Sequence, residues 1–135
     1  LLLDRVYKIL NKRLKNKQIT FLGVTFKANT DDMRDSSSLT MIPALIKKGA
    51  KIKYFDPTGY KKEFSRLKNV YNSSTIKESI IGSDLVIIHT EWNDFKSINF
   101  KNLGRGKKFI IFDMRNIYSA KKIKNQGFKY YSIGR

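Results

Sequence analysis

The chain has 135 residues and a formal net charge of +17 at pH 7. This length suits one compact domain, and a hydrophobic share of 41% with 13% aromatic residues supplies a core and excludes a disordered chain. No apolar run approaches the roughly 20 residues that cross a bilayer. With no Cys and one His, the chain cannot form disulfides, thiolate nucleophiles or His-rich metal sites, and we expect a cytoplasmic setting and no bound metal.

The excess of Lys and Arg has two interpretations. A strongly basic surface is typical of proteins that bind nucleic acids or membrane surfaces. Basic residues that are spread through the chain, at expected loops and helix C-termini, are equally typical of solvated faces and of cations that complement helix dipoles. We favour the second interpretation because no helix-turn-helix, RNP-type or zinc-finger pattern accompanies the charge.

The chain opens with a helical pattern. A helix is expected over residues 2–16, where apolar side chains recur at helical spacing: Leu3, Val6, Leu10 and Leu14. The chain begins inside this helix, which suggests a piece of a longer protein. A chain cut at this point is expected to expose the apolar stripe and to associate through it.

Strand and helix patterns then alternate. Residues 18–26 form a β-branched and aromatic run typical of a buried strand. A helix through residues 39–46 is expected to be capped by Asp35 or Ser36, to start late or bend at Pro43, and to end at Gly49. A strand over residues 51–55 and a turn over residues 56–59 follow.

The second half continues the alternation. The expected elements are a short strand near Val70, a helix over residues 75–81 ending at Gly82, a strand over 84–90, a short helix over 98–103, a strand over 109–113, a helix over 117–126 ending at Gly127, and a last strand over 129–133. This order predicts a Rossmann-like α/β fold. It is a three-layer sandwich with a mainly parallel sheet, preceded by an N-terminal helix.

Ligands of an open parallel sheet bind beyond the carboxyl ends of its strands. The segments there contain three cations, Lys27, Arg34 and Arg115. An ammonium and two guanidinium groups suit a phosphate ligand. Ion pairing accounts for the same residues equally well, because acids lie close by in the sequence: Asp31, Asp32 and Asp113.

The first strand leads into an incomplete dinucleotide fingerprint. Gly23 begins a possible G-x-G-x-x-G, but Thr25 and Ala28 stand at the second and third glycine positions. Asp56, at the end of the second strand, lies where a ribose-binding acid would be. Without the glycines we favour a turn-capping role for it, and we expect no self-sufficient NAD site.

Residues 19–40, ITFLGVTFKANTDDMRDSSSLT, closely resemble the start of the C-terminal domain in the UDP-glucose/GDP-mannose dehydrogenase family. GAKIKYFDP, SDLVIIHTEWNDF and FIIFDMRNIY are similar to later segments of that family, in the same order. The resemblance covers nearly the whole chain. The Met-Arg-Asp, Thr-Glu-Trp and Arg-Asn-Ile-Tyr sequences resemble UDP-glucose 6-dehydrogenases more than enzymes for GDP-mannose or N-acetylhexosamines.

The resemblance implies oxidation of the sugar C6 alcohol to a carboxylate, with two hydrides passed to NAD through a Cys-bound intermediate. The product, UDP-glucuronate, feeds polysaccharide biosynthesis. The Cys and the glycine-rich NAD loop belong to segments outside this chain, so the isolated chain is expected to be inactive. Residues 1–17 would be the tail of the inter-domain connecting helix, in the region that forms the homodimer, and residues 18–135 the UDP-sugar-binding domain.

The family's functional positions carry over residue by residue. Phe26 and Lys27 match positions that contact the UDP-sugar, and Arg115 matches the arginine that reaches the substrate between domains. Arg34 matches an arginine that contacts NAD on the neighbouring domain, and Asp31 and Asp32 are expected to orient it. Three further strand-end residues, Glu91, Trp92 and His89, are expected to pack or to be incidental.

Three alternatives remain from the sequence. The first is a basic nucleic-acid-binding module of Rossmann-like fold. The second is a domain of a dehydrogenase for another nucleotide sugar, and the third is a stand-alone regulatory domain that senses a nucleotide sugar.

Overall fold

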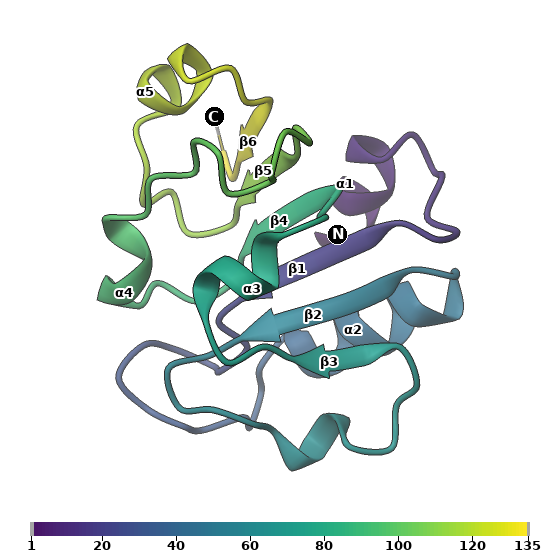
Figure 1. Ribbon diagram of the computed structural model, residues 1–135. Helices are drawn as coiled ribbons and strands as arrows, with labels where there is room; N and C mark the ends of the chain where they lie inside the picture. The colour runs from purple at the N-terminus through teal and green to yellow at the C-terminus, as the bar shows by residue number, and fades with distance from the viewer. Residues whose placement is uncertain (1, 135) are drawn as a thin grey trace.

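A fully parallel sheet forms the centre of the computed structural model, which describes residues 2–134. Its six strands follow the order β3-β2-β1-β4-β5-β6. Figure 1 shows helices on both faces of this sheet. The predicted Rossmann-like three-layer sandwich is therefore confirmed, with a sheet that is parallel throughout.

The elements in chain order are α1 (Leu2–Ile9), β1 (Gln18–Leu22), α2 (Ser38–Lys47), β2 (Lys51–Phe55), the short 3-10 helix η1 (Lys62–Phe64), β3 (Val70–Asn72), α3 (Ile76–Ile80), β4 (Leu85–Ile88), α4 (Asn93–Lys96), β5 (Ile110–Asp113), α5 (Ala120–Asn125) and β6 (Tyr130–Ser132). Each expected strand forms, and most are shorter than the sequence pattern. None of the helices within residues 2–134 has the length and apolar composition of a bilayer-spanning segment.

Two apolar cores lie on the two faces of the sheet. Successive side chains of a strand point to opposite faces, so Phe21 of β1 joins the core under α1 and α2, whereas Leu22 joins the core under α3, α4 and α5. The same division holds in β4, where Ile87 and Ile88 enter different cores. Burial on both faces explains why the strands read as continuous apolar runs.

The N-terminal helix is shorter than expected. It ends at Ile9 rather than near residue 16, because the chain turns through left-handed residues, with φ of 54° at Asn11 and 60° at Lys12. Leu10 and Leu14 are nevertheless buried in the core under α1 and α2, and Val6 is buried with them. The expectation of an exposed, associating stripe is therefore wrong, because the turn folds the apolar side chains onto the sheet.

One further local expectation is wrong. The short helix expected over residues 98–103 lies earlier, as α4, where Phe95 is buried against the sheet. At the start of α2, Ser37 holds the N-cap position without a side-chain cap hydrogen bond, but the Ser36 hydroxyl accepts the N–H of Ser38 at 3.3 Å, as expected for a capping residue. The same hydroxyl donates to the Val24 carbonyl at 2.6 Å.

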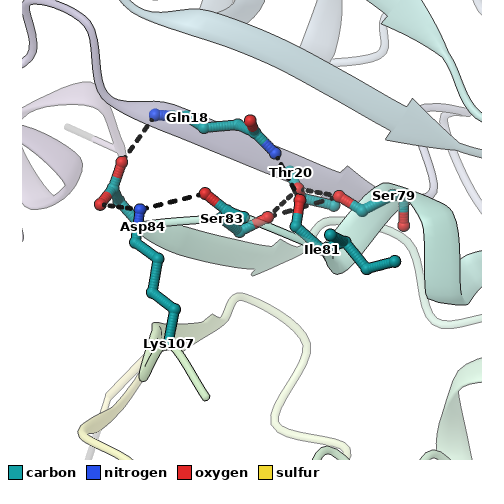
Figure 2. Close-up of polar contacts among 8 residues, drawn as sticks. Gln18, Thr20, Ser79, Ile81, Ser83, Asp84 and Lys107 are labelled. Carbon is teal, nitrogen blue, oxygen red and sulfur yellow. Dashed lines mark hydrogen bonds and ion pairs between the residues drawn. The ribbon is translucent and has the colours of Figure 1, made fainter. Parts of the chain in front are cut away.

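A buried polar cluster joins β1 to the turn between α3 and β4 (Figure 2). The hydroxyl of Thr20, in the middle of β1, donates to the Ser79 carbonyl and lies 2.5 Å from the Ser83 hydroxyl. Beside it, the backbone N–H of Gln18 donates to the Asp84 carboxylate at 2.9 Å. These bonds satisfy polar groups inside the fold, and they hold α3 and the start of β4 in place against β1.

We predict that Thr20→Val destabilises the domain by about 1–3 kcal/mol, because an isosteric methyl removes the short hydrogen bond to the buried Ser79 carbonyl and leaves it only the longer bond from the Ser83 hydroxyl, at 3.3 Å. Urea unfolding followed by circular dichroism measures the change. Thr40→Val, the same substitution at an exposed position of α2, should shift stability by less than about 0.5 kcal/mol. Equal unfolding midpoints for the two variants would contradict the structural role of the cluster.

Candidate functional site

Three loops meet at the carboxyl edge of the sheet, where β1, β4 and β5 end side by side. Arg115, in the loop after β5, connects them. Its Nε donates to the His89 carbonyl at the end of β4, at 2.8 Å, and its Nη2 donates to the Phe26 carbonyl in the loop after β1, at 3.4 Å. The structure thus brings Arg115 against the loop that contains Phe26 and its neighbour Lys27, at one edge of the sheet.

These three side chains are accessible. The Phe26 ring is 45% exposed, and Lys27 and Arg115 are exposed as well. Within residues 2–134, neither Lys27 nor Arg115 has an ion-pair partner. The Arg115 guanidinium is held by backbone carbonyls instead of a carboxylate. An aromatic ring and two positive charges without carboxylate partners can together bind an anionic ligand that carries an apolar group.

The carboxylate of Asp113 does not pair with the Arg115 guanidinium. It is fully buried, and its oxygens accept the backbone N–H of Arg115 at 3.1 Å, the backbone N–H of Tyr118 at 3.1 Å and the Tyr130 hydroxyl at 2.6 Å. The ion-pair interpretation is therefore wrong for Arg115. Asp113 instead shapes the loop from which Arg115 projects.

Arg34 differs from Arg115, because it is paired. Its Nε and Nη2 donate to the two oxygens of Asp32, each at 3.1 Å, as the sequence predicted for Asp32. These hydrogen bonds lower the pKa of the Asp32 carboxyl. The Arg34 side chain is still 88% exposed, so a neighbouring molecule or domain can reach it. It shares the loop of Lys27, which is closed by the hydrogen bond from the Phe26 N–H to the Asp32 carbonyl at 2.9 Å.

A known protein-family model matches most of the chain. Residues 20–120 match the family model described as the UDP-glucose/GDP-mannose dehydrogenase family, UDP binding domain. The chain belongs to this family.

Relatives of known name support the assignment. The chain is 38% identical to a UDP-glucose 6-dehydrogenase of Rickettsia bellii over 138 residues, covering 99% of this chain and 32% of that protein. It is 36% identical to a UDP-glucose 6-dehydrogenase of Rhizobium meliloti over 123 residues, covering 90% of this chain and 28% of that protein. The chain thus spans about a third of the length of these relatives.

Solved structures of related proteins share the fold. An NDP-N-acetyl-D-galactosaminuronic acid dehydrogenase from Methanosarcina mazei superposes with a TM-score of 0.80 at 23% identity, covering 98% of this chain and 28% of that one. A UDP-glucose dehydrogenase from Pyrobaculum islandicum gives 0.76 at 23% identity, covering 96% and 28%. At these identities the likeness shows the fold alone.

His89 has a larger part at this edge than the sequence predicted. Its buried ring bridges two elements, with Nε2 2.9 Å from the Ser37 hydroxyl at the start of α2 and Nδ1 3.1 Å from the Thr90 hydroxyl. Its carbonyl is the acceptor for Arg115. A polar residue at the end of an otherwise apolar run was the available signal, but the partners come from distant parts of the chain.

Gly23 and Trp92 serve the packing of the same edge. Gly23 has a φ of 80°, and a Cβ at this position would lie 2.5 Å from the Thr90 Cβ, so a side chain would disrupt the contact between the β1 and β4 loops. Trp92 is buried, and its ring N–H donates to the Thr25 hydroxyl at 3.3 Å. The packing role predicted for Trp92 is confirmed. The same expectation is wrong for Glu91, which is exposed.

The residues at the end of β1 do not fit a dinucleotide by themselves. Helix α2 begins only at Ser38, so no helix N-terminus follows β1 directly to hold a pyrophosphate. Asp56 is buried, and its carboxylate accepts the N–H groups of Val24 at 2.8 Å and Thr58 at 2.9 Å. Asp56 therefore caps the turn, as the sequence analysis favoured.

The buried imidazole predicts a pH dependence. Burial, with a smaller effect of the Arg115 charge, lowers the pKa of His89 to about 3. An unfolded chain has a His pKa near 6.5, so the unfolded state binds the extra proton first as pH falls. The stability due to neutral His89 is complete above about pH 6.5, and about 2 kcal/mol of it is lost by pH 5.

We therefore predict that His89→Gln, although less stable at pH 7, loses stability less steeply than the unaltered chain between pH 6.5 and pH 4. Urea titrations at several pH values measure both curves. The carboxylates are the same in both proteins, so the difference between the curves isolates residue 89. Parallel curves would contradict a buried neutral imidazole.

Proposed function

We propose that this chain is the nucleotide-sugar-binding part of a UDP-glucose 6-dehydrogenase, and that Phe26, Lys27 and Arg115 contact the UDP-sugar. The observation that carries the proposal is the bridge from Arg115 to the loop of Phe26 and Lys27 at the carboxyl edge, with no carboxylate within ion-pair distance of either cation among residues 2–134.

The chemistry of the three side chains suits a uridine diphosphate sugar. Lys27 acts as a point charge toward a phosphate, and the guanidinium N–H groups of Arg115 that are not bound to carbonyls offer directed hydrogen bonds. The exposed face of Phe26 provides an apolar surface for a ring of the ligand. Because Arg115 is already held by two carbonyls, little side-chain entropy is lost when the ligand binds.

The parent protein, in this proposal, oxidises UDP-glucose to UDP-glucuronate, and NAD held by another domain takes the hydrides. The chain contains no Cys, so it binds and orients the substrate while the thiol chemistry takes place on residues outside it. Arg34, paired to Asp32 and largely exposed, lies ready to contact the cofactor of the neighbouring domain. In this proposal, residues 1–17 are the tail of the inter-domain connecting helix, in the helical region through which the parent enzyme forms a homodimer. The parent enzyme is cytoplasmic.

Glucose is the favoured sugar because the relatives at 35–38% identity that match over nearly the whole chain are named UDP-glucose 6-dehydrogenases. Proteins of similar fold are named for N-acetylated sugars, and one of them, from Pyrococcus horikoshii, is 26% identical. A substrate panel of UDP-glucose, UDP-N-acetylmannosamine and GDP-mannose separates these alternatives.

We predict that Lys27→Ala and Arg115→Ala each lower kcat/KM of the parent enzyme for UDP-glucose by at least about tenfold, because each removes a charge-assisted contact worth roughly 1.5–3 kcal/mol. Steady-state formation of NADH measures the effect. Lys68→Ala, which removes an exposed charge at the far edge of the sheet, should leave the rate within about twofold. Unchanged kcat/KM in both site variants would remove the site assignment.

A further inference from the structure

Positive charge is concentrated on the edge of the sheet opposite the proposed sugar site. The connections that leave the strands contain acidic residues among their cations: Asp31, Asp32, Asp35, Asp56 and Glu91. The connections that lead into the strands are rich in Lys and Arg, and the acid found in them is Asp84, which is bound to Lys107 at 3.0 Å. The amino edge of the sheet is therefore strongly basic.

A hollow of about 420 Å³ lies on this edge, where α1 and the turn after it meet the end of α2. Its lining consists of four cations and two side chains with apolar surface: Lys12, Arg13, Lys15, Lys48, Tyr7 and Leu14. No carboxylate is among these lining residues. We call this hollow the basic pocket.

Backbone contacts hold the basic pocket open. The turn after α1 is closed by the Lys12 N–H, which donates to the Tyr7 carbonyl at 2.7 Å. It is docked on the end of α2 by the Asn16 N–H, which donates to the Gly49 carbonyl at 2.9 Å. A Cβ on Gly49 would lie 3.1 Å from the Lys15 Cα, so this close approach depends on glycine. The shape of the pocket is therefore set by the backbone of the turn and of the end of α2.

The cations of the basic pocket lack partners. Among the described residues, Lys12, Arg13, Lys15 and Lys48 form no ion pair. Lys48 caps α2, where a cation complements the helix dipole, but the dipole does not account for the other three around the same hollow. Four like charges repel one another, and a bound anion relieves that repulsion.

Tyr7 and Leu14 indicate what kind of anion fits. An aromatic ring beside a row of cations is the combination with which proteins bind single-stranded nucleic acids, by stacking bases and neutralising phosphates. A membrane surface is less suitable, because the large exposed apolar side chains that could insert into lipid lie elsewhere, at Phe26, Tyr60, Tyr71 and Tyr131.

We propose that the basic pocket binds a nucleotide of a single-stranded nucleic acid, with its base against Tyr7 and its phosphates on the pocket cations. The strand continues along the basic amino edge, which spans six parallel strands, or roughly 25 Å at their usual spacing. A polymer contacts several of these cations at once, which a free nucleotide cannot do. The pocket and the sugar site lie at opposite ends of β1, so the two ligands bind independently.

The test uses the 135-residue chain and a fluorescently labelled oligouridylate of about ten nucleotides, followed by anisotropy. We expect binding near physiological salt that weakens steeply as salt rises. The double variant Arg13→Glu/Lys48→Glu should weaken binding at least about tenfold. The control Lys121→Glu/Lys122→Glu makes the same charge change at exposed residues outside the pocket and should cost less than about threefold.

Each outcome of these measurements either supports or overturns the proposed strand-binding site. Equal losses in the two double variants would show that net charge alone attracts the strand, and would overturn the proposal. No binding near physiological salt would overturn it too. Free ATP and unlabelled oligouridylate are compared as competitors. If ATP displaces the labelled strand at the same concentration as oligouridylate, the pocket binds mononucleotides and the proposal of a bound strand is rejected. Undisturbed binding in the presence of UDP supports two separate sites, and thermal unfolding verifies that both variants fold.

Discussion

The hydrogen bonds of the Arg115 guanidinium are the contacts on which the carboxyl edge depends. By donating to the carbonyls of His89 and Phe26, one side chain ties the loops after β5, β4 and β1 to each other. Backbone carbonyls neutralise none of its charge, so the same group that organises the edge remains attractive to an anion. The Arg115 side chain therefore holds the three loops together and also keeps its positive charge available for a ligand.

Buried polar groups support that edge from below. The Asp113 carboxylate sets the path of the chain into Arg115, and the Asp56 carboxylate joins the end of β2 to Val24, two residues after β1. The His89 ring, kept neutral by burial, links α2 to β4 through Ser37 and Thr90. Each of these groups has hydrogen-bond partners, so its burial costs little and its geometry is rigid. The loops are therefore positioned before a ligand arrives.

The two edges of the sheet differ in electrostatics as well as in shape. Acids cluster in the loops that leave the strands, where they orient arginines such as Arg34 and cap turns. The loops that enter the strands carry more cations without an ion pair than the loops that leave them do, among the described residues, and in one place they enclose a pocket with Tyr7. The net charge of +17 is thus distributed unevenly over the molecule, and long-range attraction of a polyanion would act mainly on the amino edge.

The sequence by itself determined the order of strands and helices, the parallel sheet and the family. Apolar runs such as that of β4 and stop signals such as Gly49 depend on local chemistry that a linear reading detects. It also located the cations at the strand ends, and the family resemblance predicted that Asp32 orients Arg34, but the pairing of Arg115 stayed open. Only the tertiary structure decided that Arg115 is not paired with Asp113, because that carboxylate is occupied by Tyr118 and Tyr130, which follow it in the chain but meet it only after folding. The same holds for Leu14, whose burial after a left-handed turn at Asn11 and Lys12 depends on packing against the sheet rather than on helical spacing.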